Sequence, residues 1–214
     1  MSASKRTIWV VRHGERVDNV DKKWKANNPD IWDDPPLTLR GLQQAREVAL
    51  RLCNENIDYV ITSPFTRCVE TAREILSVHP GTAPVYIEPG LSENLSSCKS
   101  PPGEMMSRID DTYQPVYTTL PPEGPGDLGC TNRISVTIKA LLRKFSSGNI
   151  LLVSHGSPIA SIHSTLFGGW KYPGQCTIAK IADNYGNYSL EMYNSKAHLS
   201  QQINLHDESV PVPR

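Results

Sequence analysis

The sequence predicts an α/β protein whose mostly parallel sheet is flanked by helices on both faces. Short apolar runs, typical of buried strands, alternate along the chain with longer segments in which apolar residues recur every three or four positions. The run Asn149–Gly156, "NILLVSHG", is the clearest buried strand, and Leu37–Asn56 carries the clearest helical stripe. This alternation favours a layered α/β fold, in which helices connect the strands of a parallel sheet.

The expected strands and helices follow one another over most of the chain. Strands are expected at Thr7–Arg12, Tyr59–Pro64, Pro84–Gly90, Asn149–Gly156, Thr177–Asp183 and Tyr188–Tyr193. Helices are expected after the N-cap Thr38, over about Thr66–Val78 and Asn132–Phe145, after about Pro158, and around Glu104–Ile109. The tail Leu205–Arg214 is expected to fray.

The length of 214 residues fits a single domain over residues 1–214. Two long segments rich in loops, Val17–Pro36 and Leu91–Gly129, interrupt the alternation of strands and helices. Loops of this length are usually functional, so both segments are expected on the substrate side of the sheet. In the first of them, Trp24 and Trp32 are either a substrate lid or anchors that hold the loop together.

The charge of the chain is balanced, with 22 lysine and arginine residues against 22 aspartate and glutamate residues. This balance argues against a role at nucleic acids or membrane surfaces that depends on bulk charge. The sequence has no apolar run of about 18 residues and no secretory leader, so we expect no membrane association and a cytoplasmic location. Five widely spaced cysteines without a Cys-x-x-Cys pair agree with that location.

Charged and polar side chains follow four of the predicted strands at the point where each strand ends. They are Arg12 and His13 after the first strand, Arg67 after the second, Glu88 and Glu93 after the third, and His155 after the fourth. Ligands of open α/β sheets bind beyond the carboxyl ends of the strands. We therefore expect these side chains to converge on one site.

This set of side chains fits the chemistry of a phosphoryl group, which is close to a dianion at neutral pH. A planar guanidinium matches its oxygens, a neutral imidazole can attack phosphorus, and a carboxylic acid can protonate the leaving oxygen. None of these steps requires a metal or a cofactor, so neither is expected. A cysteine-based tyrosine phosphatase is excluded, because no cysteine of the chain is followed by an arginine six positions later.

Four motifs in the same order resemble the histidine phosphatase superfamily, once named for phosphoglycerate mutase. They are "RHG" at 12–14, "SPFTR" at 63–67, "LSE" at 91–93 and "SHG" at 154–156. The stretch "LTLRGLQQA" also resembles the family's Leu-Thr-x-x-Gly-x-x-Gln-Ala helix start, and the resemblance runs from about Thr7 to Gly168. It implies a phosphoglycerate mutase-like fold.

The resemblance also implies roles for individual residues. His13 matches the nucleophile that becomes phosphohistidine, and Arg12, Arg67 and His155 match the phosphate pocket. Glu93 matches the acid of the family's Leu-x-Glu and is our choice as proton donor. Glu88, directly at the end of the strand, is the competing carboxylate.

Arg16 departs from the common family pattern, which has serine at this position, whereas Asn19 falls where that pattern has its asparagine. "RHGERVD", "DPPLT", "SPxxRCVxTA" and "EPGLxE" together resemble one subgroup. It comprises the phosphatase domain of the suppressors of T-cell receptor signalling and the insect ecdysteroid-phosphate phosphatases. There the matching arginine contacts phosphate, so Arg16 is assigned to the pocket. The alternative is a surface ion pair with Glu15 or Asp18.

The function we expect is a metal-independent phosphomonoester hydrolase that acts on a phosphorylated small molecule or a phosphotyrosine protein. The first rival is a phosphoglycerate mutase. Mutases of the family usually continue Leu-x-Glu with Arg-His-Tyr-Gly, but here "NLSSC" follows Glu93. The second rival is a non-catalytic protein that binds phosphorylated ligands. The sequence leaves the physiological substrate undetermined and a homodimer open.

Overall fold

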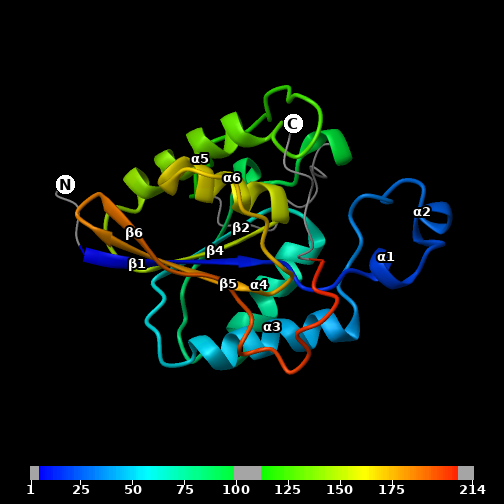
Figure 1. The fold of residues 1–214 in the computed structure, drawn as a ribbon, viewed down its shortest axis with the longest axis horizontal. Coiled ribbons are helices and arrows are strands. Elements are labelled where there is room, and N and C mark those ends of the chain that lie inside the picture. Colours follow the sequence, from blue (N-terminus) through cyan, green and yellow to red (C-terminus); the bar gives the residue numbers. More distant parts are fainter. Residues whose placement is uncertain (1–4, 99–111, 207–214) are drawn as a thin grey trace.

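A computed structural model describes residues 5–98 and 112–206 and confirms the α/β class. The strands form one sheet in the order β3-β2-β4-β1-β5-β6 (Figure 1). They are β1 (Lys5–Arg12), β2 (Tyr59–Thr62), β3 (Val85–Ile87), β4 (Ile150–Ser154), β5 (Ile178–Asn184) and β6 (Asn187–Ser195). The first four are parallel, while β5 and β6 extend the sheet in antiparallel fashion. The sheet is therefore mixed, with a parallel half that carries the expected strand ends.

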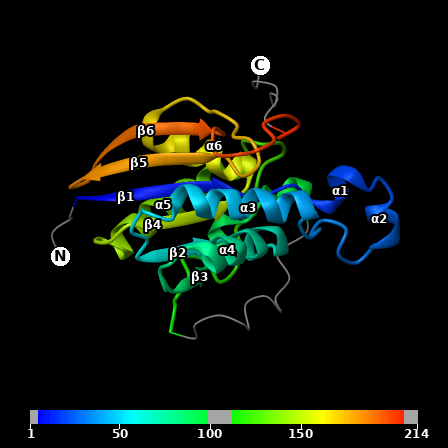
Figure 2. The same cartoon turned by 90° about the horizontal axis from the view of Figure 1, so that it is seen from below.

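Helices cover both faces of the sheet, as Figure 2 shows for the layer of α3 (Leu39–Leu52) and α4 (Thr66–Val78). The opposite face is covered by α5 (Thr131–Lys144) and α6 (Gly156–Phe167). A hydrophobic core lies on each face of the sheet, and alternate residues of β1 point into one or the other. Trp9 and Val11 pack in the core under α3 and α4 (the α3/α4 core), and Ile8 and Val10 pack in the core under α5 and α6 (the α5/α6 core). Burial on both sides explains why the central strands are continuous apolar runs rather than alternating ones.

The segment Val17–Pro36 contains two single-turn helices, α1 (Val17–Val20) and α2 (Trp24–Asn27), where the sequence predicts irregular structure. Neither helix has a buried residue, so neither carries the apolar stripe by which a helix is found in a sequence. In Figure 1 both project beyond the end of the sheet. Two further single turns, η1 (Pro89–Leu91) and η2 (Leu95–Ser97), follow β3.

Two expectations differ from the structure at helix and chain ends. α6 begins at Gly156, before the expected Pro158, because proline is tolerated in the first turn, where its missing N–H would have no intrahelical partner. The sequence predicts a tail that frays from Leu205, but Leu205 is fully buried in the α3/α4 core and its carbonyl accepts from Gln175 N–H. The helix expected around Glu104–Ile109 lies outside the described residues.

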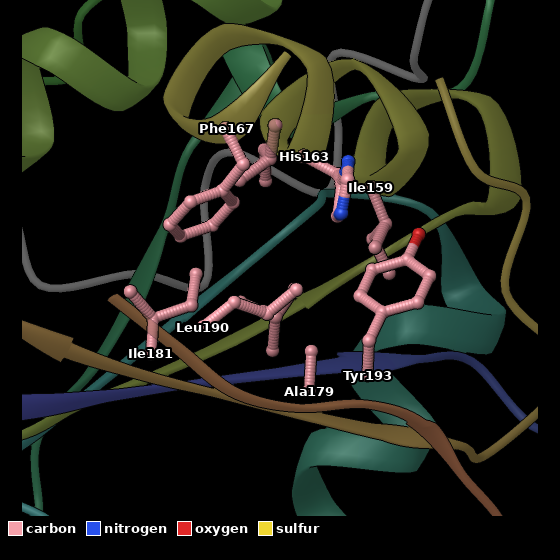
Figure 3. A pocket seen from close by; sticks show the side chains of 9 residues that line it. Ile159, His163, Phe167, Ala179, Ile181, Leu190 and Tyr193 are labelled. Atoms are coloured by element: carbon pink, nitrogen blue, oxygen red, sulfur yellow. The ribbon is translucent and has the colours of Figure 1, made fainter. Parts of the chain in front are cut away.

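An apolar gap lies between α6 and the sheet (Figure 3). It is lined by residues such as Ile159, Phe167 and Leu190 and has a volume of about 10 Å³. Such a space holds at most one water molecule and offers it few polar partners, so the gap is a packing defect of the core. None of the described helices has the length and apolar content that a membrane span would need.

Candidate active site

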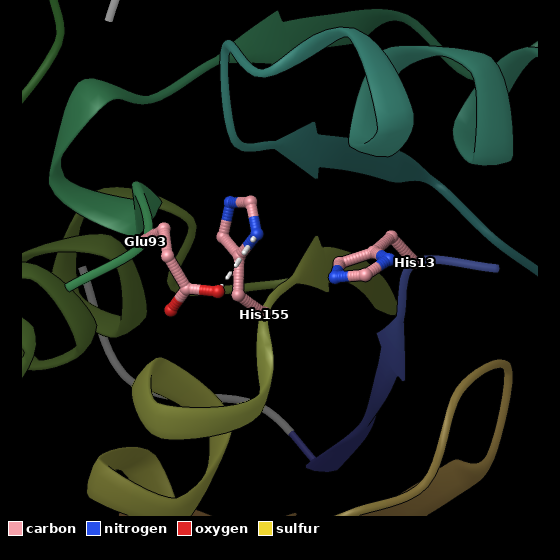
Figure 4. Close-up of side chains that lie close together, drawn as sticks. All are labelled: His13, Glu93 and His155. Carbon is pink, nitrogen blue, oxygen red and sulfur yellow. Dashed lines mark ion pairs between the residues drawn. The ribbon is translucent and has the colours of Figure 1, made fainter. Parts of the chain in front are cut away.

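His13 and His155 stand at the carboxyl ends of two neighbouring parallel strands. β1 and β4 pair with Arg12 opposite Ser154, and the N–H of His13 donates to the carbonyl of Ser154 at 3.0 Å. The two imidazole rings lie edge to face with their centroids 5.3 Å apart. Figure 4 shows Glu93 reaching the same place from the segment after β3, with Oε2 3.6 Å from Nδ1 of His155.

The His13 ring is fully buried and fixed in one orientation. Its Nδ1 lies 2.8 Å from the carbonyl oxygen of Gly14, which can only accept, so Nδ1 carries the proton. Nε2 then holds a lone pair, and it has no hydrogen-bond partner within the described part of the chain. Burial, followed by the positive charges of Arg67, Arg12 and Arg16, lowers the pKa of this imidazole well below its ordinary value of 6.5. The neutral ring therefore presents an unengaged nucleophilic nitrogen.

His155 is the second buried imidazole, and both of its nitrogens are engaged. Nε of Arg67 donates to Nδ1 at 3.2 Å, and Nε2 lies 2.7 Å from Oγ of Ser63. A guanidinium only donates, so Nδ1 of the imidazole accepts and Nε2 carries its proton toward the serine. Burial and then the charge of Arg67 lower the pKa of His155 well below 6.5. This ring is neutral for the same physical reason as that of His13.

Arg67 lies at the centre of the cluster with only 1% of its surface exposed. It stands in the first turn of α4, where its Nη1 donates to the carbonyl of Asp33 at 3.0 Å and its guanidinium lies 4.4 Å from the Phe65 ring centroid. Its Nη2 is 3.9 Å from Oε2 of Glu93. The arginine thus connects the second strand end, the Val17–Pro36 segment and the carboxylate.

Arg12 connects the end of β1 to the C-terminal segment. Its Nη1 donates to the carbonyl oxygens of Pro173 and His206, each at 2.8 Å, and its guanidinium lies 4.9 Å from the centroid of the Tyr172 ring. Its charge contributes to the lowered pKa of His13. Arg12 is therefore close enough to the cluster to influence its protonation.

Arg16 lines a cavity of about 310 Å³ together with Arg67 and Glu93. Its backbone N–H donates to Oδ1 of Asn19 at 3.1 Å, which fixes the start of α1. Its Nη2 also pairs with Asp18 at 2.9 Å, with about a quarter of each side chain exposed. The sequence offers two alternatives for Arg16, a place in the phosphate pocket and a surface ion pair. In the structure Arg16 lines the cavity and also forms the ion pair with Asp18.

Trp24, Lys25 and Trp32 line the same cavity from the Val17–Pro36 segment. The indole N–H of Trp24 donates to the carbonyl of Trp32 at 3.1 Å, and Nζ of Lys25 lies 4.1 Å from the centroid of the Trp32 ring. The tryptophans thus anchor the loop and also face the cavity. Ser97 and Cys98, at the start of the second long segment, complete this side of its lining.

The two candidate carboxylates lie in different surroundings. Glu88 is fully buried and accepts hydrogen bonds from Gly90 N–H, the Tyr113 hydroxyl and the N–H groups of Val116 and Tyr117. Burial raises its pKa. These contacts bind the loop after residue 111 to the end of β3. Glu93 is the carboxylate that lies with the two histidines.

His13, Glu93 and His155 each place one ligand-type atom within 4.8 Å of the others, a spacing that a metal ion could bridge. Three guanidinium groups influence the same space, since Arg67, Arg12 and Arg16 all lower the pKa of His13. A divalent cation would be repelled by these charges, whereas a phosphoryl dianion would be attracted. The residues present therefore fit an anion.

The match with known proteins covers most of this structure. Residues 8–203 match the histidine phosphatase superfamily (branch 1). The chain belongs to this superfamily. The described order of strand-end residues agrees with the motifs "RHG", "SPFTR", "LSE" and "SHG" read from the sequence.

Relatives of this chain include the human ubiquitin-associated and SH3 domain-containing protein B, 30% identical over 207 residues. That match covers 77% of this chain but 32% of the relative, so the chain spans about a third of the length of that protein. The adenosylcobalamin/alpha-ribazole phosphatase of Escherichia coli is 28% identical over 167 residues, which cover 75% of this chain and 79% of the relative.

Solved structures share the fold at low sequence identity. The ecdysone phosphate phosphatase from Bombix mori in complex with tungstate has a TM-score of 0.69 at 19% identity, covering 89% of this chain and 93% of that one. The phosphoglycerate mutase from Bacillus anthracis has a TM-score of 0.66 at 19% identity, covering 92% and 96%. The chain therefore has a phosphoglycerate mutase-like fold.

The family-like stretch "LTLRGLQQA" has a physical role that the sequence alone does not reveal. Its Thr38 hydroxyl donates to the carboxylate of Glu15 at 2.8 Å, and Oε1 of Gln44 accepts from Glu15 N–H at 2.9 Å. A Cβ on Gly41 would lie 2.3 Å from the carbonyl oxygen of Glu15, so only glycine allows this approach. The start of α3 thus clamps the backbone that follows His13. Sequence reasoning identified the motif but missed Glu15 as its docking partner.

Proposed function

We propose that this protein is a metal-independent phosphomonoesterase that works through a phosphohistidine intermediate. The observation that carries the proposal is the Nδ1–H of His13 donating to Gly14, which leaves Nε2 as a buried lone pair with no partner among the described residues. An imidazole fixed in this tautomer and kept neutral is suited to nucleophilic attack.

In the first step, Nε2 of His13 attacks phosphorus and the bond to the leaving oxygen breaks. Arg12, Arg16 and Arg67 hold the phosphoryl oxygens through charge-assisted hydrogen bonds, and the neutral His155 joins them when its Nε2–H turns from Ser63 to the anion. Glu93, protonated in the substrate complex, gives its proton to the leaving oxygen. In the second step the same carboxylate accepts a proton from water, which attacks the phosphohistidine and releases inorganic phosphate.

The mutase alternative receives less support from the residues after Glu93. Asn94 is 2% exposed, and its side chain is occupied by Gly126 O and by the N–H and hydroxyl of Ser96. It offers no cation for a carboxylate substrate at the place where mutases of the family usually have arginine. A hydrolase acting on phosphorylated small molecules or on phosphotyrosine proteins is the proposal that remains.

The experiment that tests the proposal compares wild type with His13→Ala on p-nitrophenyl phosphate. We expect the variant to lose turnover and the wild type to form an acid-labile phosphoenzyme that persists in alkali. His79→Ala is the matched control, because His79 is also largely buried but lies at the C-terminal end of α4, where it bonds Glu55 O. Near wild-type turnover in His13→Ala would refute the mechanism. Phosphate or vanadate binding without turnover on any phosphomonoester would instead identify a binding protein.

A further inference from the structure

Arg133, in the first turn of α5, is a buried arginine outside the phosphate cluster. It is 2% exposed, and its donors meet backbone carbonyls and the carboxylate of Glu123. Nη1 donates to the carbonyls of Gly90 at 2.7 Å and Ser92 at 2.9 Å, and Nη2 donates to the carbonyl of Glu93 at 3.0 Å. One guanidinium therefore holds three carbonyls of the short segment that ends at the candidate proton donor.

Glu123 completes this clamp from the opposite side. Its Oε1 accepts from Nε of Arg133 and its Oε2 accepts from the N–H of Leu95 at 2.8 Å. The ion pair therefore holds the backbone on both sides of Glu93. Regular structure gives this backbone little support, because it runs between two single turns, η1 and η2. A buried arginine and glutamate at this position fix the segment where helix and strand hydrogen bonds do not.

The clamp affects the carboxylate of Glu93 through a short path. Oε1 of Glu93 accepts from the N–H of Asn94 at 3.0 Å, which directs Oε2 toward Arg67 and His155. A proton donor is effective only within hydrogen-bond reach of the leaving oxygen, and a displacement of about 1 Å can cost a large part of the rate. The position of the backbone at 93–94 therefore decides where the proton is delivered.

We propose that Arg133 is a positioning residue for proton transfer by Glu93, although it touches neither the phosphate nor the leaving group. This proposal rests on the proposed function, because it requires Glu93 to be the acid. Glu123 acts in the same way through its pairing with Arg133. A merely structural role for the pair would change the stability of the fold without affecting proton delivery in particular.

The test measures how kcat/KM depends on the leaving group. Phenyl phosphate needs its leaving oxygen protonated, whereas 2,4-dinitrophenyl phosphate releases a stable phenolate without help. We expect Arg133→Lys to lower kcat/KM for phenyl phosphate at least about tenfold more than for the dinitrophenyl ester, since a positioned acid contributes on the order of 10²-fold or more. Lysine keeps the positive charge beside Glu123 but loses the fork that reaches three carbonyls. Glu123→Gln retains an acceptor for the N–H of Leu95. It is also expected to lower kcat/KM more for phenyl phosphate than for the dinitrophenyl ester, but by a smaller factor than Arg133→Lys.

Arg6→Met is the matched control, because Arg6 is also a buried arginine, paired with Asp183 and Leu142 O at the start of β1. It is expected to lower stability and to affect both esters equally. Equal losses on both esters in Arg133→Lys would overturn the positioning role.

Glu93→Gln tests the proposed function separately. If this variant loses kcat/KM equally on both esters, the acid assignment fails and the positioning role fails with it. If it is selective while Arg133→Lys is not, only the positioning role fails.

Discussion

Arg67 donates its Nε–H to Nδ1 of His155 across 3.2 Å, so a buried cation is held by a buried neutral histidine. The histidine in turn is oriented by Ser63, 2.7 Å from its Nε2. This chain of contacts fixes the plane of the Arg67 guanidinium before any ligand arrives. Preorganisation of this kind matters because a charged donor that need not reorganise stabilises developing charge more effectively.

Arg67→Lys is expected to lower kcat/KM for p-nitrophenyl phosphate by about 10- to 100-fold, the effect of losing one charge-assisted hydrogen bond. A lysine keeps the charge but cannot bond His155, Asp33 and a phosphoryl oxygen from one planar group. Steady-state kinetics would measure the loss. Arg73→Lys, an exposed position on the same helix, is the control and is expected to change nothing. Unchanged kinetics in Arg67→Lys would contradict the proposed phosphate contact.

The pKa of His13 is expected to lie well below 6.5 in the folded protein, because burial and three arginines disfavour the imidazolium. The neutral nucleophile then persists as the pH falls through 6.5, and protonation takes place only at lower pH. The same shift makes folding stability depend on pH. The contribution of His13 to stability is fully present above the pKa of the unfolded chain, near 6.5, and is lost as the pH falls through the lower pKa of the folded protein. An NMR titration of the His13 ring, assigned with His13→Gln, measures the pKa directly.

Arg16→Gln tests whether nearby positive charges contribute to the lowered pKa of His13. Removing one of the three nearby charges is expected to raise the pKa of His13 toward its ordinary value, with desolvation still holding it below. Lys22→Gln removes a charge from the exposed side of the same loop and is expected to leave the titration unchanged. A His13 pKa at or above 6.5 in the wild type would mean that the ring is more hydrated than the structure indicates.

The sequence predicted the elements that have a strong period or a continuous apolar run. α3 starts after Thr38, whose hydroxyl accepts from the N–H of Gly41 as the N-cap prediction requires, and α4 spans Thr66–Val78 as expected. The single-turn helices α1 and α2 escaped prediction because four residues cannot produce a helical apolar pattern. The sequence does not predict the burial of Leu205, because a single leucine at the start of an aperiodic tail gives no helical or strand pattern.

For the site, the order of strand ends was enough to collect the candidate residues, because parallel neighbours end at the same edge. The resemblance favours Glu93 over Glu88 as proton donor, but the sequence does not reveal the loop contacts that occupy Glu88, since they come from residues 113–117, far along the chain. The sequence also does not predict that Arg133 bonds the backbone around Glu93. Its donors meet carbonyl oxygens, which every residue possesses and no sequence pattern marks.

Arg16→Ser, which restores the residue common in the wider family, is expected to weaken binding of inorganic phosphate by about tenfold, the contribution of a charge-assisted hydrogen bond. The backbone bond to Asn19 would remain, so the loop is expected to keep its place. The surface pair with Asp18 contributes little, and its loss should hardly change stability. Competitive inhibition by phosphate measures the effect, with Lys22→Ser as the charge-matched control. Equal inhibition constants in wild type and Arg16→Ser would show that Arg16 does not bind phosphate and forms only its surface ion pair with Asp18.

Glu88→Gln is expected to lower the free energy of unfolding by about 1–3 kcal/mol without changing leaving-group selectivity. The carboxylate faces only donors, including the N–H groups of Gly90 and Val116 and the hydroxyl of Tyr113. An amide would turn an NH₂ group against them and leave buried donors unpaired. Urea denaturation measures the loss, and Glu55→Gln, a surface carboxylate paired with Arg51, is the control expected to change stability little.

The kinetic half of the same experiment decides between the two carboxylates. If Glu88 only anchors its loop, Glu88→Gln hydrolyses phenyl and 2,4-dinitrophenyl phosphate with the wild-type ratio of kcat/KM values, while Glu93→Gln loses the phenyl ester selectively. The opposite pattern, selective loss in Glu88→Gln with stability unchanged, would transfer the acid role to Glu88. Such a result would require the loop contacts of Glu88 to open in the substrate complex, since all of its hydrogen bonds in the structure are made to the protein's own donors.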